Sequence, residues 1–188
     1  MTTATGNSAA AVTIRSERLT LRSWRESDRA EFAALNGAPE VMQDLAGPLD
    51  RAGSDAKFDR YVTAFERCGF CRWALEDTDG QFLGYAGVMP SRPYHPLGLH
   101  ADIGWRLKRS AWGRGYATEA AKAALRDVFA RTPLKEVLAY TSADNLRSQA
   151  VIGRLNMQRA ASLDYSEPLG TATWHGMVWI ARPEHGRP

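Results

Sequence analysis

The sequence predicts one domain of mixed α/β class, and three observations support this. Segments with the two-residue period of half-buried strands alternate along the chain with segments of helical period. A chain of 188 residues, of which 44% are hydrophobic, can build one sizeable core. The chain contains no internal repeat, low-complexity block or linker. We therefore expect a single domain over residues 13–183, after a disordered tail of small and polar residues over 1–12.

The N-terminal third reads as one strand followed by two helices. Residues 17–22 alternate apolar and polar side chains, as a half-buried first strand should. Ser27 or Asp28 can cap a first helix, and Pro39 disfavours the continuation of that helix. A second helix fits residues 54–67, where the large apolar side chains share one helical face.

A hairpin and a loop occupy the middle of the chain. Residues 71–76 and 81–88 are strand-like and are joined by a turn over 77–80 that ends in glycine. Residues 89–99 contain three prolines and must form a loop.

A strand, a tight loop and a helix over residues 103–125 are the most informative feature. The strand covers 103–107, and the loop Trp112-Gly-Arg-Gly115 leads into a helix that starts at about Tyr116. A helix start carries unpaired N–H groups and a positive dipole end, so it attracts anions. Gly113 and Gly115 lack a Cβ, so a phosphate can approach the backbone closely, and Arg114 can add a charged contact at the rim. The pattern predicts a phosphate-binding loop.

Two common phosphate-binding loops do not fit. The loop lacks the Gly-Lys-Ser/Thr ending of a P-loop, which argues against nucleotide hydrolysis. It also lacks a third glycine at Rossmann spacing, and no βαβ unit precedes it.

The C-terminal third predicts a further strand, a short helix and two strands. These elements fit residues 136–141, 147–155, 162–168 and 173–181. Asn145 and Ser148, three residues apart, lie on the same side of one helical turn. Either they cap the helix, because asparagine and serine are favoured N-cap residues, or they serve a binding site.

The segment Ile103–Leu125 closely resembles the acetyl-CoA signature of the GNAT superfamily of N-acetyltransferases. The run Trp112-Gly-x-Gly-Tyr-Ala-Thr-Glu-Ala120 and the opening Glu17-Arg-Leu-x-Leu-Arg22 resemble its RimJ/RimL branch. The resemblance covers about 16–182. It implies a mainly antiparallel sheet flanked by helices and splayed between the fourth and fifth strands, where the gap admits the pantetheine arm. It also implies the following cofactor-binding residues: Leu107, Trp112, Gly113, Arg114, Gly115, Tyr116, Ala117, Thr118, Asn145 and Ser148.

The activity that the resemblance implies is direct acetyl transfer from acetyl-CoA to a primary amine in a ternary complex, without a metal. Such a reaction needs a neutral amine, a stabilised oxyanion and a proton for the leaving thiolate. In the RimJ/RimL branch the asparagine matched by Asn145 hydrogen-bonds the pantetheine, and the serine matched by Ser148 faces the sulfur. Many members carry a tyrosine four residues later as the thiolate's acid, but this chain has Ile152. Either Ser148 therefore donates the proton, or the thiolate leaves unassisted.

The general base is open between several candidates. Asp102 precedes the signature strand, Glu167 lies in the C-terminal part that approaches the acceptor in RimL-like enzymes, and His175 suits proton transfer near neutral pH. A water relay is a further alternative. Because Ile152 cannot donate a proton and no base stands out, a second hypothesis is an acyl-CoA-binding regulatory protein that has lost the chemistry.

The composition indicates which classes of partner to expect. The formal charge is +3 and the basic residues are scattered, so we expect no nucleic-acid partner. No apolar run is long enough to span a membrane, and no signal peptide is present, so we expect a cytoplasmic protein without a membrane partner. The lone pair Cys68 and Cys71 could be a redox pair or half a zinc site, but ordinary thiols are the better interpretation.

The amine acceptor is expected to be a protein N-terminus or a modest-sized metabolite. A polycationic aminoglycoside would favour a strongly acidic loop, and the sequence has none. We expect a monomer or a homodimer.

Overall fold

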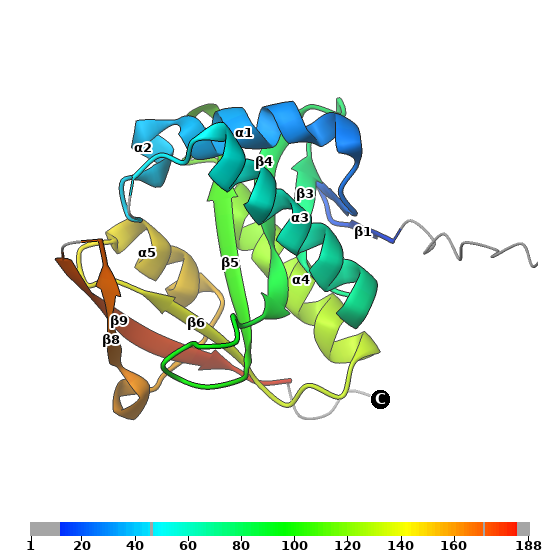
Figure 1. The fold of residues 1–188 in the computed structure, drawn as a ribbon. Helices are drawn as coiled ribbons and strands as arrows, with labels where there is room; N and C mark the ends of the chain where they lie inside the picture. The colour runs from blue at the N-terminus through cyan, green and yellow to red at the C-terminus, as the bar shows by residue number, and fades with distance from the viewer. Residues whose placement is uncertain (1–11, 46, 171, 184–188) are drawn as a thin grey trace, which may run out of the picture.

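The computed structural model describes residues 12–45, 47–170 and 172–183, and residues 1–11 of the predicted tail lie outside them. The strands follow the order β1-β2-β3-β4-β5-β6-β9-β7, and β8 pairs with β9 (Figure 1). The helices are α1 (Arg29–Gly37), α2 (Pro39–Met42), α3 (Arg51–Cys68), α4 (Tyr116–Arg131) and α5 (Leu146–Arg154). The strands are β1 (Thr13–Arg15), β2 (Thr20–Arg22), β3 (Arg72–Glu76), β4 (Phe82–Pro90), β5 (Ala101–Leu107), β6 (Val137–Thr141), β7 (Gln158–Arg159), β8 (Tyr165–Leu169) and β9 (Ala172–Ala181).

The sheet is antiparallel except where β5 meets β6. These two strands are parallel and share one registered pair, Asp102 with Leu138, near their N-terminal ends. Beyond that pair they diverge, and α5 lies beside β6 (Figure 1). They are the fourth and fifth strands that the sequence predicted, so the expected mixed sheet with a splay is confirmed.

Two helical layers cover the sheet. On one face α4 packs against β4 and β5 through a stripe of small buried residues that includes Ala120, Ala121 and Ala124. Small side chains let the helix approach the strands closely. On the other face α1 and α3 enclose an aromatic cluster, in which Trp24 packs edge-on against Phe32 with their ring centroids 5.0 Å apart.

The predicted first strand over 17–22 is wrong in its extent. The chain forms a hairpin of β1 and β2, with a turn in which the Ser16 N–H donates to the Leu19 carbonyl at 2.9 Å. Glu119 of α4 accepts from the Arg18 N–H at 2.7 Å. This contact draws the chain toward α4, so only residues 20–22 remain in β2.

The helix boundaries also differ from the predictions. Asp28 does not cap α1 through its side chain, because its carboxylate accepts from the Arg22 guanidinium at 2.7 Å and from the Arg25 N–H at 2.8 Å. Pro39 starts the short helix α2, since the first position of a helix needs no N–H donor. Helix α3 begins at Arg51 rather than at 54, because the Asp50 carboxylate caps it by accepting from the Gly53 N–H at 2.7 Å.

Strand boundaries shift by a few residues. Strand β4 continues to Pro90, its last residue, which lies opposite Ala101 of β5. The strand predicted from 162 begins only at Tyr165, because residues 161–163 form a 3-10 turn, and the short β7 was not predicted.

Candidate active site

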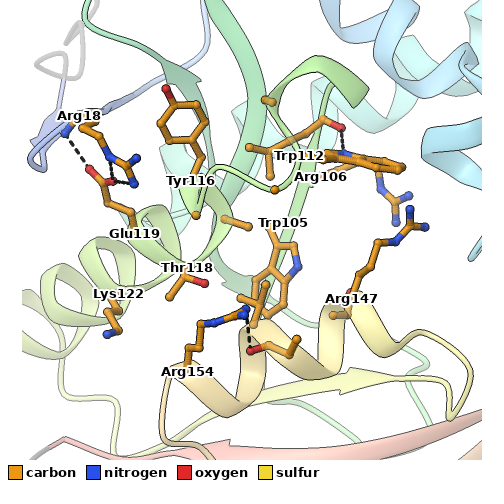
Figure 2. Close-up of a pocket in the computed structure, with 18 of the residues that line it drawn as sticks. Arg18, Trp105, Arg106, Trp112, Tyr116, Thr118, Glu119, Lys122, Arg147 and Arg154 are labelled. Atoms are coloured by element: carbon orange, nitrogen blue, oxygen red, sulfur yellow. Dashed lines mark hydrogen bonds and ion pairs between the residues drawn. The ribbon is translucent and has the colours of Figure 1, made fainter.

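The first cavity lies where β5, the start of α4 and α5 come together, and its volume is about 750 Å³. Trp105 is part of the cavity wall, and Figure 2 shows it between α4 and α5. Of the predicted cofactor-binding residues, the wall includes Leu107, Trp112, Gly113, Gly115, Tyr116, Ala117, Thr118 and Ser148. The structure therefore brings most of the predicted residues together around one opening.

The loop before α4 has the geometry that anion binding requires. Gly113 and Gly115 have φ angles of +74° and +80°, a region that other residues rarely adopt. Gly115 occupies the N-cap position, so no side chain of its own covers the amide groups of the first turn of α4. A Cβ at 113 would meet nothing within 4 Å, so the backbone there is open to an incoming group. These amide groups fit a phosphate.

Cationic side chains surround the loop. The guanidinium carbons of Arg109 and Arg147 lie 4.7 and 4.2 Å from the ring centre of Trp112. The indole N–H of Trp112 donates to the Leu107 carbonyl at 2.9 Å, which fixes the ring (Figure 2). Arg154 also belongs to the wall. The positive rim suits a ligand that carries several phosphates.

Arg18 is a wall residue that the sequence analysis missed. Its Nε donates to Glu119 at 2.8 Å and its Nη1 donates to the Arg114 carbonyl at 3.0 Å, so it joins the N-terminal hairpin to the loop. Burial pushes the pKa of Glu119 upward, but hydrogen bonds from Arg18 and Ser16 hold it below its ordinary value. Residues 17–22 were assigned to a strand and their resemblance to the RimJ/RimL branch was noted, but Arg18 was given no place in the site.

Two predicted cofactor residues lie apart from the described cavity wall. The Asn145 side chain accepts from the Ser148 N–H at 3.0 Å, so it caps α5. The Arg114 guanidinium lies over the Tyr116 ring, 4.9 Å from its centre. Among the described residues, neither Asn145 nor Arg114 belongs to the wall of the first cavity.

A second cavity of about 790 Å³ opens between α3, the loop over 91–100 and strands β5 and β6. Trp105, Arg106 and Ser148 line both cavities. The two cavities therefore meet at these three residues, beside the divergence of β5 and β6. Ile152 also lines the second cavity and offers no proton donor.

The candidate bases occupy different positions. Asp102 and Glu167 line the second cavity, but each is paired with an arginine, Asp102 with buried Arg72 and Glu167 with Arg92. His175 hydrogen-bonds the Ser166 hydroxyl at 2.8 Å and is exposed. It is not part of either described cavity wall.

A polar cluster that borders the second cavity was also missed. The Lys57 ammonium donates to the Asn36 side-chain carbonyl at 2.7 Å and to the Tyr85 hydroxyl at 2.9 Å. Its members come from α1, α3 and β4 and are far apart in the sequence. No local pattern reveals them.

In the described ranges the cysteines form no disulfide, and the possible metal ligands form no metal site. Cys71 is buried, and burial raises the pKa of its thiol to about 12, while Cys68 is exposed and unbridged. Within residues 12–45, 47–170 and 172–183 no three His, Cys, Asp or Glu side chains gather closely enough to hold a metal. In the same ranges no helix has the length and apolar character needed to cross a bilayer.

Comparison with known proteins places this geometry in a family. The profile of the acetyltransferase (GNAT) domain matches residues 18–158. The chain belongs to the GNAT acetyltransferase family. It is 28% identical over 149 residues to the uncharacterized protein YkkB of Bacillus subtilis, covering 78% of this chain and 86% of that protein. It is also 28% identical over 149 residues to FsC-acetyl coenzyme A-N(2)-transacetylase of Aspergillus fumigatus, covering 74% of this chain and 62% of that protein.

Solved structures share the fold over almost the whole chain. An acetyltransferase from Agrobacterium tumefaciens superposes with a TM-score of 0.79 at 25% identity and covers 92% of this chain and 95% of its own. The ribosomal L7/L12 α-N-protein acetyltransferase RimL, without ligand, gives a TM-score of 0.74 at 17% identity, covering 92% and 95%. GNAT enzymes use acetyl-CoA and acetylate amines, so this GNAT protein is an N-acetyltransferase. The glycine loop, open helix start and cationic rim fit the phosphates of that co-substrate.

Proposed function

We propose that this GNAT protein transfers the acetyl group directly from acetyl-CoA to a primary amine while both substrates are bound. The observation that carries this proposal is the meeting of two cavities at Trp105, Arg106 and Ser148. A thioester that enters through the first cavity and an amine that enters through the second would meet there. No acyl-enzyme is needed, because the amine can attack the thioester directly. Buried Cys71 is a poor nucleophile, and Cys68 lines the second cavity but not the first.

The chain's own residues supply binding and proton transfer. The amide groups at the start of α4 hold the pyrophosphate, and the gap between β5 and β6 admits the pantetheine arm. The amine forms a C–N bond with the acetyl carbon and the C–S bond breaks. Ser148 lines both cavities, and its hydroxyl supplies a proton to the leaving thiolate.

The proton that leaves the amine passes out through the second cavity. Asp102 is held by Arg72 in the wall, and its side chain is only 8% exposed. Glu167 is 20% exposed and its partner Arg92 lies at the surface. A carboxylate near water exchanges protons more readily, so Glu167, reached directly or through water, is the better candidate for the final proton acceptor.

The acceptor is a primary amine on a peptide terminus or a modest-sized metabolite. The test is transfer from labelled acetyl-CoA to three pools: N-terminal peptides, amino-acid-like amines and aminoglycosides. We expect label in the first two pools. Preferential labelling of aminoglycosides would contradict the acceptor class, and labelling of lysine side chains over α-amines would argue against N-terminal acetylation.

The second candidate function is a regulatory acyl-CoA-binding protein, and Ile152 in the position of a proton donor favours it. Steady release of free CoA with any of the three pools would eliminate it. Tight acetyl-CoA binding without turnover across all three pools would support it.

A further inference from the structure

The second cavity carries an unbalanced positive charge. Each carboxylate in its wall is paired with an arginine: Asp102 with Arg72, Glu167 with Arg92, and Asp59 with Arg29 of α1 at 2.8 Å. The acidic groups of the cavity are therefore already neutralised.

The remaining cations in that wall have no such partner. Lys57, Arg60, Arg67 and Arg106 all line the cavity, and within the described residues none of them forms an ion pair with a carboxylate. The first three lie on α3 at spacings of three and seven residues, which places them along one side of that helix. A row of unpaired positive charge thus faces the cavity.

The deepest part of this row is the corner formed by Lys57, Tyr85 and Arg106. Arg106 lies directly opposite Tyr85 in the pairing of β4 with β5, and the Lys57 ammonium is 2.9 Å from the Tyr85 hydroxyl. Both cations make neutral hydrogen bonds, Lys57 to the Asn36 side-chain carbonyl at 2.7 Å and Arg106 to the Val41 carbonyl. Holding two cations in a partly buried corner without a counter-charge is unfavourable.

The ionisation of the corner reflects this missing counter-charge. The pKa of Lys57 is lowered by burial and by the positive charges of Arg106 and Arg60. Burial acts to raise the pKa of Tyr85, but Lys57 and Arg106 outweigh it and bring that pKa below its ordinary value. Both shifts indicate a corner whose potential favours an anion.

We propose that the corner of Lys57, Tyr85 and Arg106 binds an anionic group of the acceptor, so that the preferred substrate is an amine that also carries a carboxylate or a phosphate. The inference rests on the proposed function and names its substrate class. Arg106 belongs both to this corner and to the residues at which the cavities meet, so an anion bound in the corner leaves the amine of the same molecule free to reach the acetyl group. Arg60 and Arg67 on the cavity rim attract the anion on its approach.

The test uses pairs of acceptors in which one member carries an anionic group that its partner lacks. The pairs are phenylalanine with phenylalaninamide, O-phosphoethanolamine with ethanolamine, and an Asp-Ala-amide peptide with an Asn-Ala-amide peptide. In at least one pair we expect kcat/KM for the anionic member to exceed that of its partner by about tenfold or more. The pair that shows the preference identifies an amino acid, a phosphate ester or an acidic peptide as the source of the anion. Equal rates, or faster reaction of the uncharged members in all pairs, would overturn the proposal while leaving the transferase activity established.

Substitutions test whether the corner causes the preference for anionic acceptors. Lys57→Met removes the charge and keeps the length of the side chain, and it should reduce the preference to about threefold or less, mainly by raising KM for the anionic acceptor. Lys135→Met is the matched control, because Lys135 is exposed and lies in neither cavity wall, and it should leave the preference unchanged. An undiminished preference in Lys57→Met would contradict the assignment. If Lys57→Met does not fold, Arg60→Gln, at the exposed rim of the cavity, should still lower the preference and make it less sensitive to salt concentration.

Binding separates failure of this inference from failure of the proposed function. If no acceptor is acetylated, calorimetry with CoA-saturated protein compares N-acetylphenylalanine with N-acetylphenylalaninamide. Tighter binding of the acid by about tenfold supports the anion site without turnover, whereas equal binding overturns it.

Discussion

The two cavities are built from different kinds of groups. The first is built around one continuous stretch, from the end of β5 to the first turn of α4, and its central elements are backbone amides and two glycines in the left-handed region. The second draws charged side chains from α3, β3, β5, the loop over 91–100 and β8. Backbone amides are present whatever the side chains are, whereas the charge of the second cavity's wall changes when one of its charged residues is substituted.

This difference indicates which cavity should determine the choice of amine. The proposed co-substrate site depends on glycine and a helix start, so most side-chain changes there should have modest effects. The acceptor faces side chains that are individually replaceable, such as Lys57 and Arg106, and whose charges are tuned by one another. The choice of amine should therefore follow the second cavity, and the following changes test that division.

The largest effect is expected where the cavities meet. Ser148→Ala should lower kcat by about 10²–10⁴-fold and change the KM for acetyl-CoA little, because proton donation matters mainly in the transition state. Steady-state CoA release measures it, with Ser162→Ala as an exposed serine control. A loss under about threefold would mean that Ser148 contributes only to the start of α5.

The next effect is a loss of stability when a buried ion pair in the wall of the second cavity is broken. Asp102→Ala leaves the Arg72 guanidinium, 10% exposed, without its counter-charge, and should lower the free energy of unfolding by about 3–5 kcal/mol. Urea unfolding measures the change. The control is Glu136→Ala, which breaks a pair with Arg182 in which the two side chains are 52% and 49% exposed and which should cost less than about 1 kcal/mol. Equal losses of unfolding free energy in the two variants would show that burial does not increase the contribution of the Arg72–Asp102 pair to stability.

A smaller effect is expected in the first cavity. Gly115 has φ +80°, and a valine there costs about 1–2 kcal/mol of backbone strain. It also places methyl groups in the phosphate space, so affinity for acetyl-CoA should fall by about tenfold or more in calorimetry. Gly80→Val, in the β3–β4 turn at φ +76°, carries the same strain far from the cavity and should bind acetyl-CoA normally. Unchanged affinity in Gly115→Val would place the co-substrate elsewhere.

The last effect expected is a pH dependence of stability from His95 in the second cavity. Its Nδ1 accepts from the Leu97 N–H at 3.1 Å, so its Nε2 carries the proton toward the Tyr165 hydroxyl, also at 3.1 Å. Burial, and then the positive charges of His100 and Arg92, lower the pKa of His95 to about 4.

Because the folded protein disfavours charged His95, its contribution to stability is complete above the unfolded pKa of about 6.5 and is lost as the pH falls toward 4. His95→Phe removes this titration. Unfolding measured from pH 7 to pH 4 should therefore show wild type losing stability relative to the variant as the pH falls. A constant difference across that range would contradict the neutral, buried state of His95.

The sequence predicted the backbone around the first cavity because its determinants are local. The order strand, glycine loop and helix over 103–125 specifies both the backbone path and the residues that surround it, and the structure follows it closely. Errors arose where a distant contact decided the outcome. Glu119 of α4 draws Arg18 out of the predicted strand, and the Arg22 guanidinium takes the Asp28 carboxylate away from helix capping.

The second cavity was largely out of reach of sequence reasoning. Asp102 and Glu167 were identified as candidate bases, but their arginine partners come from β3 and from the loop over 91–100, 30 and 75 residues away. Lys57 and Tyr85 are 28 residues apart and meet only because α3 lies over β4. Periodicity marks such residues as part of a helix or a strand and does not show which charges they neutralise.

Direct transfer in a ternary complex is tested most directly by initial rates of CoA release, with acetyl-CoA and the best amine of the three acceptor pools varied together. The meeting of the two cavities at Trp105, Arg106 and Ser148 predicts double-reciprocal lines that intersect, because both substrates must be present before the acetyl group moves. Parallel lines, together with labelled acetyl retained on the protein in the absence of amine, would show an acyl-enzyme and contradict the account.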